Sequence, residues 1–385
     1  MPTEFPAALI SNPSDLKPST PWSETRWAWV GEEELISHTT VPRLCVATLL
    51  PFKDGKPDWT GFVRCIRWMQ EVAAYYNVEV VFVLNADTGY IFDLTPELYG
   101  EVLSRFRAEF PTQKFIAGVT ARGAENDTAF RAERYRPLLD LAQQHDHCEV
   151  MIMTSRLLNV LDPERRRDAY FEIAEFITRP ALVHALEPAF VPWATPYEPW
   201  LLWQLAQHPK FVGGKVSTLD EPHFLYWSAM CRDLGLDFTP HSGDDFGICT
   251  AIKLGFPLLI GAGASAAPLI CAAIDMWRDN SVGVKKVRTQ GGCFDTRVYK
   301  LFEAIQSFED TVFRLDQRGS AAAYKHSTAH ALRQLGYLES AEAHPACRDL
   351  RGADEAARIA EALVRPARMA KRLGIPQFEP RAGGE

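Results

Sequence analysis

The sequence predicts an α/β protein built on a (β/α)8 TIM barrel, with an N-terminal extension and a C-terminal extension of three helices. From residue 43, short apolar runs rich in β-branched residues alternate with longer amphipathic runs, and eight such units follow one another. The sequence contains neither the GxGxxG motif typical of open dinucleotide-binding sheets nor a GxxxxGK[ST] loop. We expect an extension over 1–42, a barrel over 43–294 and a helical extension over 295–385.

Each strand is expected where apolar residues run together, because both faces of a parallel sheet are buried. The expected strands span 44–50, 78–85, 114–119, 148–154, 181–186, 210–216, 236–241 and 257–262. Amphipathic runs predict helices over 58–75, 95–109, 128–145, 162–177, 198–207, 221–233, 246–254 and 265–279. Alternation of strand and helix indicates a parallel sheet, and eight repeats favour its closure into a barrel.

The two ends of the chain lack this alternation. The first 42 residues contain Trp22, Trp27 and Trp29 in an irregular segment, where the tryptophans are expected to dock against the barrel. After the barrel, three further helices are expected over 295–316, 319–335 and 352–372.

Composition excludes several classes of protein. The chain has 385 residues, of which 47% are hydrophobic and 23% charged, and a net charge of −8, which gives no basic footprint for nucleic acid. No basic and apolar leader opens the sequence, and prolines and glycines interrupt the longest apolar stretch, 256–274, so no membrane segment is expected. The eight cysteines form no CxxC pair, which favours free thiols and a cytoplasmic location.

Lys215 is the strongest candidate for chemistry. It follows Phe-Val-Gly-Gly at the end of the sixth strand, and barrel active sites form at the carboxyl ends of the strands. Partial burial would lower the pKa of such a lysine, and a neutral amine can form a Schiff base with a ketone. A lysine that reaches solvent or pairs with a carboxylate is the alternative.

Polar residues follow two other strands. Asp87, Thr88 and Gly89 come after the second strand, where a hydroxyl and backbone N–H groups could hold a substrate carboxylate, although the charge of Asp87 opposes this and a solvated turn is the alternative. Ser242 and Gly243 come after the seventh strand and are expected to line the substrate pocket.

The polar run after the seventh strand also contains His241, Asp244 and Asp245. We expect one of the two aspartates to cap the helix that follows.

His184 lies within the fifth strand, and a neutral imidazole there could transfer protons beside a Schiff base. A hydrogen-bonded core histidine is the alternative, and Glu187 is a second acid–base candidate. Metal binding is not expected, because His145 and His147 precede their strand on the face opposite the active site. We expect no cofactor.

Together, these segments resemble the dihydrodipicolinate synthase / N-acetylneuraminate lyase family, in patches from about Val46 to Leu363. The matching segments, in chain order, are Ala47-Thr48 with Pro51-Phe52, Asp54-Gly55 and Asp58; Asp87-Thr88-Gly89 with Leu94-Thr95-Pro96-Glu97; Ile116-Ala117-Gly118-Val119; Gly214-Lys215 with Ser217 and Thr218; Ser242-Gly243-Asp244-Asp245 with Leu254-Gly255; Gly261 to Ser265; and Ala323-Tyr324-Lys325 with Leu335-Gly336. The resemblance implies a barrel with a helical tail, a Schiff-base lysine at Lys215, a 2-keto acid substrate and a homo-oligomer, dimer or tetramer.

Several positions depart from the family pattern. Asp87 stands where the family has its first hydroxyl, Tyr90 replaces a glutamate, and His184 replaces the tyrosine of the fifth strand. The paired tyrosines that follow the fourth strand correspond here to Thr154-Ser155-Arg156-Leu157, and Arg156 is a candidate grip for a second anionic group. The biosynthetic condensation of the family is therefore not expected of this chain.

Three functions stay open. The first is a Schiff-base lyase, aldolase or dehydratase that acts on a 2-keto acid through Lys215, with His184 as acid–base. The second is a barrel that has lost catalysis and serves as a ligand-binding or scaffold protein. The third is a hydrolase that uses Asp87, Glu187 and Asp245.

Overall fold

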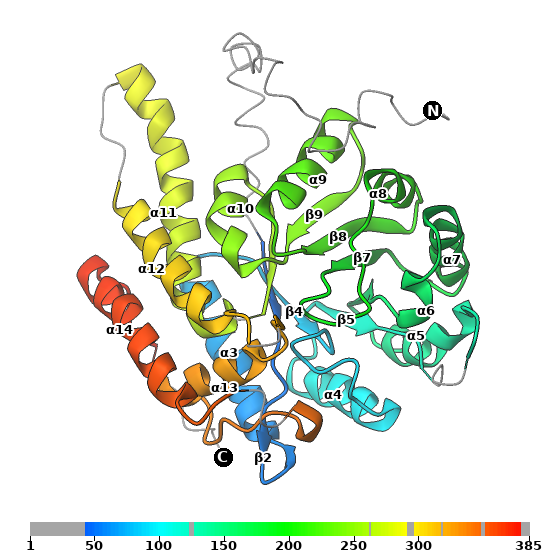
Figure 1. Ribbon diagram of the computed structural model, residues 1–385. Coiled ribbons are helices and arrows are strands. Elements are labelled where there is room, and N and C mark those ends of the chain that lie inside the picture. Colours follow the sequence, from blue (N-terminus) through cyan, green and yellow to red (C-terminus); the bar gives the residue numbers. More distant parts are fainter. Residues whose placement is uncertain are drawn as a thin grey trace.

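The computed structural model describes residues 43–122, 127–261, 263–290, 296–316, 319–347 and 351–378, without the side chains of Phe246 and 280–290. Eight parallel strands close into a barrel in the order β1-β10-β9-β8-β7-β6-β5-β4 (Figure 1). The predicted (β/α)8 fold is thus confirmed. The expected N-terminal extension, with its three tryptophans, lies outside the described residues.

Every strand of the barrel falls where an apolar run predicted one. Their bounds are Leu44–Ala47 (β1), Val80–Leu84 (β4), Phe115–Val119 (β5), Cys148–Ile152 (β6), Ala181–Leu186 (β7), Phe211–Ser217 (β8), Thr239–Ser242 (β9) and Leu258–Ile260 (β10). All six residues of β7 are buried, as expected of a strand covered on both faces.

Some of the helices around the barrel begin at side-chain caps that the sequence encodes. Asp58 accepts a hydrogen bond from Gly61 N at the start of α3, and Thr95 Oγ1 accepts one from Leu98 N ahead of Pro96 in α4. The barrel helices are Trp59–Tyr75 (α3), Pro96–Glu109 (α4), Arg136–Gln143 (α5), Arg156–Asn159 (α6), Pro163–Glu175 (α7), Pro199–Ala206 (α8), Glu221–Asp233 (α9), Ile248–Leu254 (α10) and Gly263–Gln290 (α11), with 3-10 turns at Ala132–Tyr135 (η3) and Asp245–Gly247 (η4).

Three details differ from the expectation. Strands β2 (Phe52–Lys53) and β3 (Lys56–Pro57) form a small hairpin, because Asp54 and Gly55 have φ of 53° and 73° and make the two-residue turn that hairpins favour. The short helix α6 was not anticipated. Helix α11 continues past 279 to Gln290, although the residues 280–283, Asn-Ser-Val-Gly, have low helix propensity.

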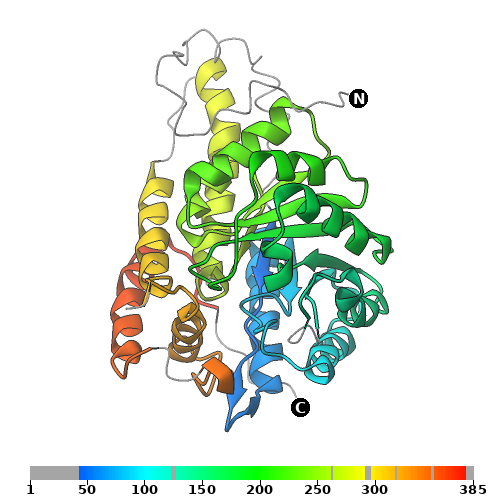
Figure 2. The ribbon, with the colours of Figure 1, turned by 45° about the vertical axis from the view of Figure 1, so that its right-hand side comes forward.

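The C-terminal extension consists of helices Arg297–Val312 (α12), Tyr324–Gln334 (α13) and Glu355–Leu373 (α14), with a 3-10 turn at Pro345–Cys347 (η5). Together with α11 these helices gather on one side of the barrel, away from α5 to α8 (Figures 1 and 2). The chain between α12 and α13 reaches across the strand ends. Ala321 N donates to Ala189 O after β7 at 2.7 Å, and Tyr324 contacts Thr88 after β4.

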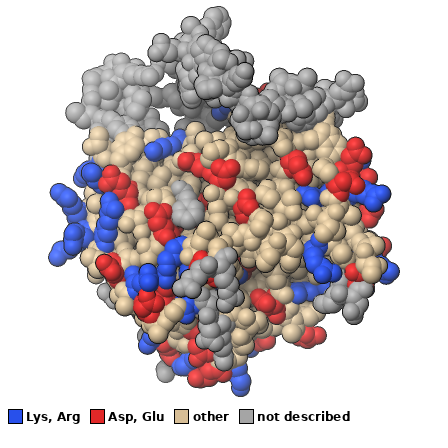
Figure 3. Space-filling view, in the orientation of Figure 1, with Lys and Arg blue, Asp and Glu red and all other residues tan. Residues whose placement is uncertain are grey.

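No helix in the described part of the chain is long and apolar enough to cross a membrane. On the face shown in Figure 3, acidic and basic side chains are interspersed.

Candidate active site

Lys215 lies near the carboxyl end of β8 and is 5% exposed. Its neighbours in register are His184 on β7 and His241 on β9. No hydrogen bond or ion pair joins its Nζ atom to any residue that the structure describes. Lys215 is therefore a buried amine that is not in direct contact with a carboxylate from the described part of the chain.

The surroundings of Lys215 favour its neutral form. Burial lowers the pKa of Lys215, and the positive charge of Lys325 acts in the same direction. The carboxylates of Asp87, Asp245 and Asp244 oppose this shift without cancelling it. A lowered pKa raises the fraction of nucleophilic amine at neutral pH, as Schiff-base chemistry requires.

His184 is fully buried beside Lys215. Its Nε2 lies 3.2 Å from Ser217 Oγ and its Nδ1 lies 3.2 Å from Met153 Sδ. Burial, and then the charge of Lys215, hold the pKa of His184 well below its ordinary value, so the imidazole is neutral. The structure thus brings Lys215 and His184 together, with the hydroxyl of Ser217 linking the histidine to the strand of the lysine.

Asp87 and Thr88 are buried after β4 and contact α13 rather than water. Lys325 Nζ donates to Asp87 Oδ1 at 2.9 Å, and Tyr324 OH donates to Asp87 Oδ2 at 2.9 Å. The Tyr324 hydroxyl also lies 2.7 Å from Thr88 Oγ1. The negative charge of Asp87 is therefore balanced by the C-terminal extension, and the solvated turn considered for this segment is excluded by its burial.

Gly89 is needed for space within the same loop. A Cβ atom there would lie 3.0 Å from Asn85 N, and Gly89 N already donates to Ala86 O at 3.0 Å. Its amide is engaged in the turn, and the side chains of Asp87 and Thr88 are the groups of this loop that contact Tyr324.

Ser242 and Gly243 lie at the carboxyl end of β9, next to Lys215. A Cβ atom on Gly243 would lie 2.6 Å from Lys215 Cε and 2.4 Å from Ser217 Oγ. The missing side chain at Gly243 is what leaves room for the stem of the lysine. Ser242 is fully buried, and its Oγ lies 3.5 Å from Asp244 O.

The remaining polar residues after β9 have structural partners. His241 contacts Arg43 Nη2 through Nε2 at 2.9 Å and Thr239 O through Nδ1 at 3.0 Å. Neither aspartate caps α10, so the capping expectation was wrong. Asp244 Oδ1 instead accepts from Leu219 N at 2.9 Å, and Asp245 Oδ1 accepts from Gly263 N at 3.3 Å, at the start of α11.

Two candidates are less buried than Lys215. Arg156 is exposed at the first residue of α6. Glu187 follows β7 and is only partly buried, and burial followed by the charge of Asp220 raises its pKa.

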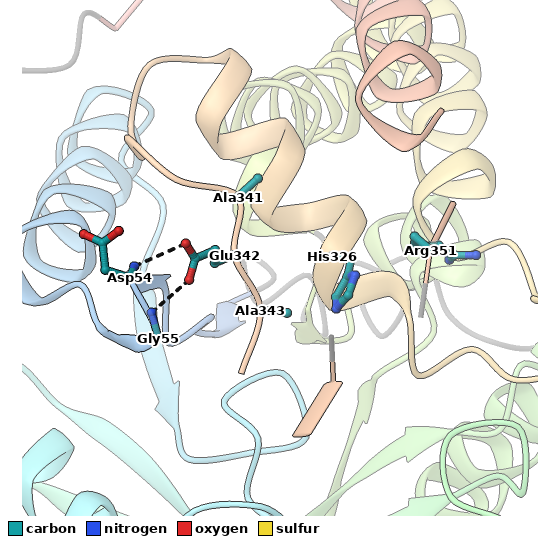
Figure 4. Close-up of a pocket in the computed structure, with 7 residues that line it drawn as sticks. All are labelled: Asp54, Gly55, His326, Ala341, Glu342, Ala343 and Arg351. Atoms are coloured by element: carbon teal, nitrogen blue, oxygen red, sulfur yellow. Dashed lines mark hydrogen bonds between the residues drawn. The ribbon is translucent and has the colours of Figure 1, made fainter. Parts of the chain in front are cut away.

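A separate cavity of about 570 Å³ opens between the β2–β3 hairpin and the C-terminal extension (Figure 4). Glu342 closes one side by accepting from Gly55 N at 3.0 Å and Asp54 N at 3.2 Å, and His326 and Arg351 line the other. None of its lining residues belongs to β8, β9 or the loops directly after these strands. Among the described residues, no group of three or more His, Cys, Asp or Glu side chains is arranged to hold a metal ion.

Sequence reasoning missed three residues of this cluster. Ser217, Tyr324 and Lys325 were visible only as parts of family-like segments, and none was assigned to the site. Tyr324 and Lys325 lie more than two hundred residues beyond Thr88 and Asp87. Only the path of the chain from α12 to α13 brings them over the barrel mouth.

No family model matches the sequence, and no curated protein matches it. Solved structures share its fold. Dihydrodipicolinate synthase from Bacteroides thetaiotaomicron superposes with a TM-score of 0.66 at 16% identity, covering 84% of this chain and 98% of that one. The enzyme from Acinetobacter baumannii, complexed with pyruvate, gives 0.64 at 19% identity over 88% and 100%. A prophage protein of the dihydrodipicolinic acid synthase family from E. coli K12, also with pyruvate, gives 0.65 at 14% identity over 87% and 99%.

Proposed function

We propose that this chain is a Schiff-base-forming lyase of the aldolase or dehydratase kind, that it acts on a 2-keto acid through Lys215, and that it is a divergent relative of dihydrodipicolinate synthase. The observation that carries the proposal is the buried Lys215 amine, which has a lowered pKa and no direct ion-pair partner among the described residues. Such a lysine at the carboxyl end of a barrel strand has the properties of an imine-forming nucleophile.

The chemistry begins when the neutral amine of Lys215 attacks the ketone carbon, water leaves, and a protonated imine results. The imine withdraws electrons from the adjacent carbon, so a proton or a carbon substituent on that carbon can leave. His184, held neutral beside Lys215, would accept that proton and return it. Ser217 Oγ, 3.2 Å from His184 Nε2, would hold the imidazole ring in position.

The carboxylate of the substrate would bind near Thr88. Thr88 Oγ1 lies beside the hydroxyl of Tyr324. That hydroxyl and the ammonium of Lys325 both donate to the carboxylate of Asp87, so a cation lies close to the hydroxyl pair. A hydroxyl pair beside a cation provides the donors that a carboxylate needs. Gly89, Ser242 and Gly243 would shape the pocket, and Arg156 would meet a second anionic group only if its side chain turns inward. The pyruvate complexes of two structural neighbours support the choice of substrate class.

We include a cytoplasmic location and a homo-oligomeric assembly, dimer or tetramer, in the proposal. Neither nucleic acid nor membrane is expected as a partner.

Borohydride reduction tests the proposal directly. The chain would be incubated with pyruvate and a panel of longer 2-keto acids, reduced, and weighed by intact mass spectrometry. A mass increase that equals the reduced adduct is expected for wild type and should be absent from K215R. A complete absence of adducts over the panel would reject the imine mechanism.

A ligand-binding or scaffold role is the second candidate, and one observation favours it. The segment from Gly319 to Lys325 crosses the strand ends. There Tyr324 hydrogen-bonds to Thr88 and Lys325 to Asp87, so these polar groups of the loop after β4 already have partners. In that case pyruvate would raise the melting temperature of wild type and K215R equally, and neither would form an adduct.

A further inference from the structure

A pair of buried acids lies where the C-terminal extension packs against the loop after β9. Glu309, on α12 of the C-terminal extension, packs against the η4 turn that carries Asp245. The two side chains are 0% and 1% exposed. Asp245 Oδ1 accepts from Gly263 N, whereas Asp245 Oδ2 and both carboxyl oxygens of Glu309 have no hydrogen-bond donor among the described residues.

The two carboxyl groups lie within hydrogen-bond reach of each other. Two ionised carboxylates offer only acceptors and repel, so a close buried pair requires one proton between them. The electrostatics agree with the geometry. Burial raises the pKa of Asp245 to about 7, and burial with the charge of Asp245 raises the pKa of Glu309 well above its ordinary value.

The charges around the pair are few. Lys215 on β8 is the cation that acts on Asp245, and Asp244 beside it adds negative charge. Asp310 adjoins Glu309 on α12, and the charge of Asp245 also acts on Tyr324 of α13. Asp245 of the pair thus interacts electrostatically with the reactive amine, and Glu309 ties the pair to the C-terminal extension.

We propose that Asp245 and Glu309 share one proton and serve as the proton reserve for imine formation at Lys215, with Asp245 facing the amine and Glu309 acting through Asp245 as a positioning residue. The shared proton follows from the pair itself, whereas its use in catalysis rests on the proposed function. His184 does not supply this proton, because its imidazole is neutral.

Atoms and charges balance in this step. The Lys215 nitrogen forms a bond to the ketone carbon, and one of its protons moves to the oxygen. The C–O bond then breaks, and the oxygen leaves as water after it takes the shared proton from the pair. The pair passes from one negative charge to two as the imine becomes positive, so the new charges lie side by side. Hydrolysis of the imine at the end of the cycle returns the proton.

The test compares wild type with E309Q, D245N and a control, E303Q, whose exposed side chain lies on the same helix and contacts Arg365. The first measurement is the infrared band of a protonated buried carboxyl group, followed across the neutral pH range. Wild type and E303Q should keep this band above neutral pH, because the charge of Asp245 adds to burial in raising the pKa of Glu309, whereas E309Q and D245N, which retain a single carboxyl of the pair, should lose it at lower pH. The D245N amide keeps an oxygen acceptor for Gly263 N, so this variant serves if E309Q does not fold.

The second measurement is the rate of borohydride trapping with pyruvate as a function of pH. E309Q removes the second acid, so the proton must come from Asp245 alone, and one pH unit above its pKa of about 7 leaves about tenfold less of the acid form. A trapping rate at least about tenfold lower is therefore expected above neutral pH, with E303Q unchanged. An E309Q variant with the same infrared band and the same trapping rate as wild type would overturn the proposal. A wild type that shows the band but forms no adduct would reject the catalytic use, and with it the proposed function, while the shared proton would stand.

Discussion

Lys325 of α13 donates a hydrogen bond of 2.9 Å to Asp87 Oδ1, and this ion pair is buried within the mouth of the barrel. The two side chains are 6% and 4% exposed. The pair ties the C-terminal extension to the loop after β4, and it places a cation where Asp87 alone would repel an anionic substrate.

Loss of Lys325 should therefore destabilise the fold. K325A leaves the Asp87 carboxylate buried without its cation, and breaking such a pair costs about 3–5 kcal/mol. Urea unfolding should show this loss, while K325M combined with D87N should recover most of it because no charge is left unpaired. K53A is the control, since Lys53 and Glu339 are exposed and their pair should contribute no measurable stability. A K325A variant as stable as wild type would contradict the account.

Gly243 should tolerate no side chain. G243A would bring a methyl group within 2.6 Å of Lys215 Cε, and the lysine would have to move from its position. We expect the rate of borohydride trapping to fall at least about tenfold while the chain still folds. G100A is the matched control, because its Cβ would meet only Leu141 at 3.7 Å and alanine favours the interior of α4. Equal trapping rates for the two variants would show that the Lys215 stem does not depend on Gly243.

His184 should control proton transfer at carbon rather than imine formation. H184Q retains a polar group toward Ser217 but removes the basic ring, so exchange of the pyruvate methyl protons with D2O should slow by about 10²-fold or more. Adduct formation with borohydride should change far less. H145Q, at the end of the barrel opposite Lys215, should exchange as fast as wild type. Exchange in H184Q at the wild-type rate would remove His184 from the mechanism.

Asp244 should make stability depend on pH. Burial, opposed by the amide of Leu219, raises the pKa of Asp244 to about 6. A carboxyl whose pKa is higher in the folded state favours folding below the unfolded-state pKa of 3.8, and this contribution is lost as pH rises through about 6. D244N keeps an acceptor for Leu219 N but cannot ionise. The free energy of unfolding of D244N minus that of wild type should increase from pH 3.8 to about 6, by at most about 1.4 kcal/mol per pH unit. A difference that does not change with pH would contradict the raised pKa of Asp244.

The sequence predicted the barrel well because each strand is buried on both faces and therefore appears in the sequence as a short apolar run. Lys215 and His184 could be found for the same reason, since each lies in an apolar strand and pairs across β7 and β8. Lys325 and Glu309 could not. Each lies on an amphipathic helix whose pattern predicts burial of one face but not its partner, and their contacts with Asp87 and Asp245 depend on how the C-terminal extension folds over the mouth.

The central claim is that Lys215, and not the neighbouring buried Lys325, carries the imine. The most direct measurement is peptide mapping by mass spectrometry of wild type after reduction with borohydride in the presence of pyruvate. We expect the reduced adduct on the peptide containing Lys215, no adduct on K215R, and an adduct retained by K325R. An adduct on Lys325, or no adduct with any 2-keto acid of the panel, would contradict this claim.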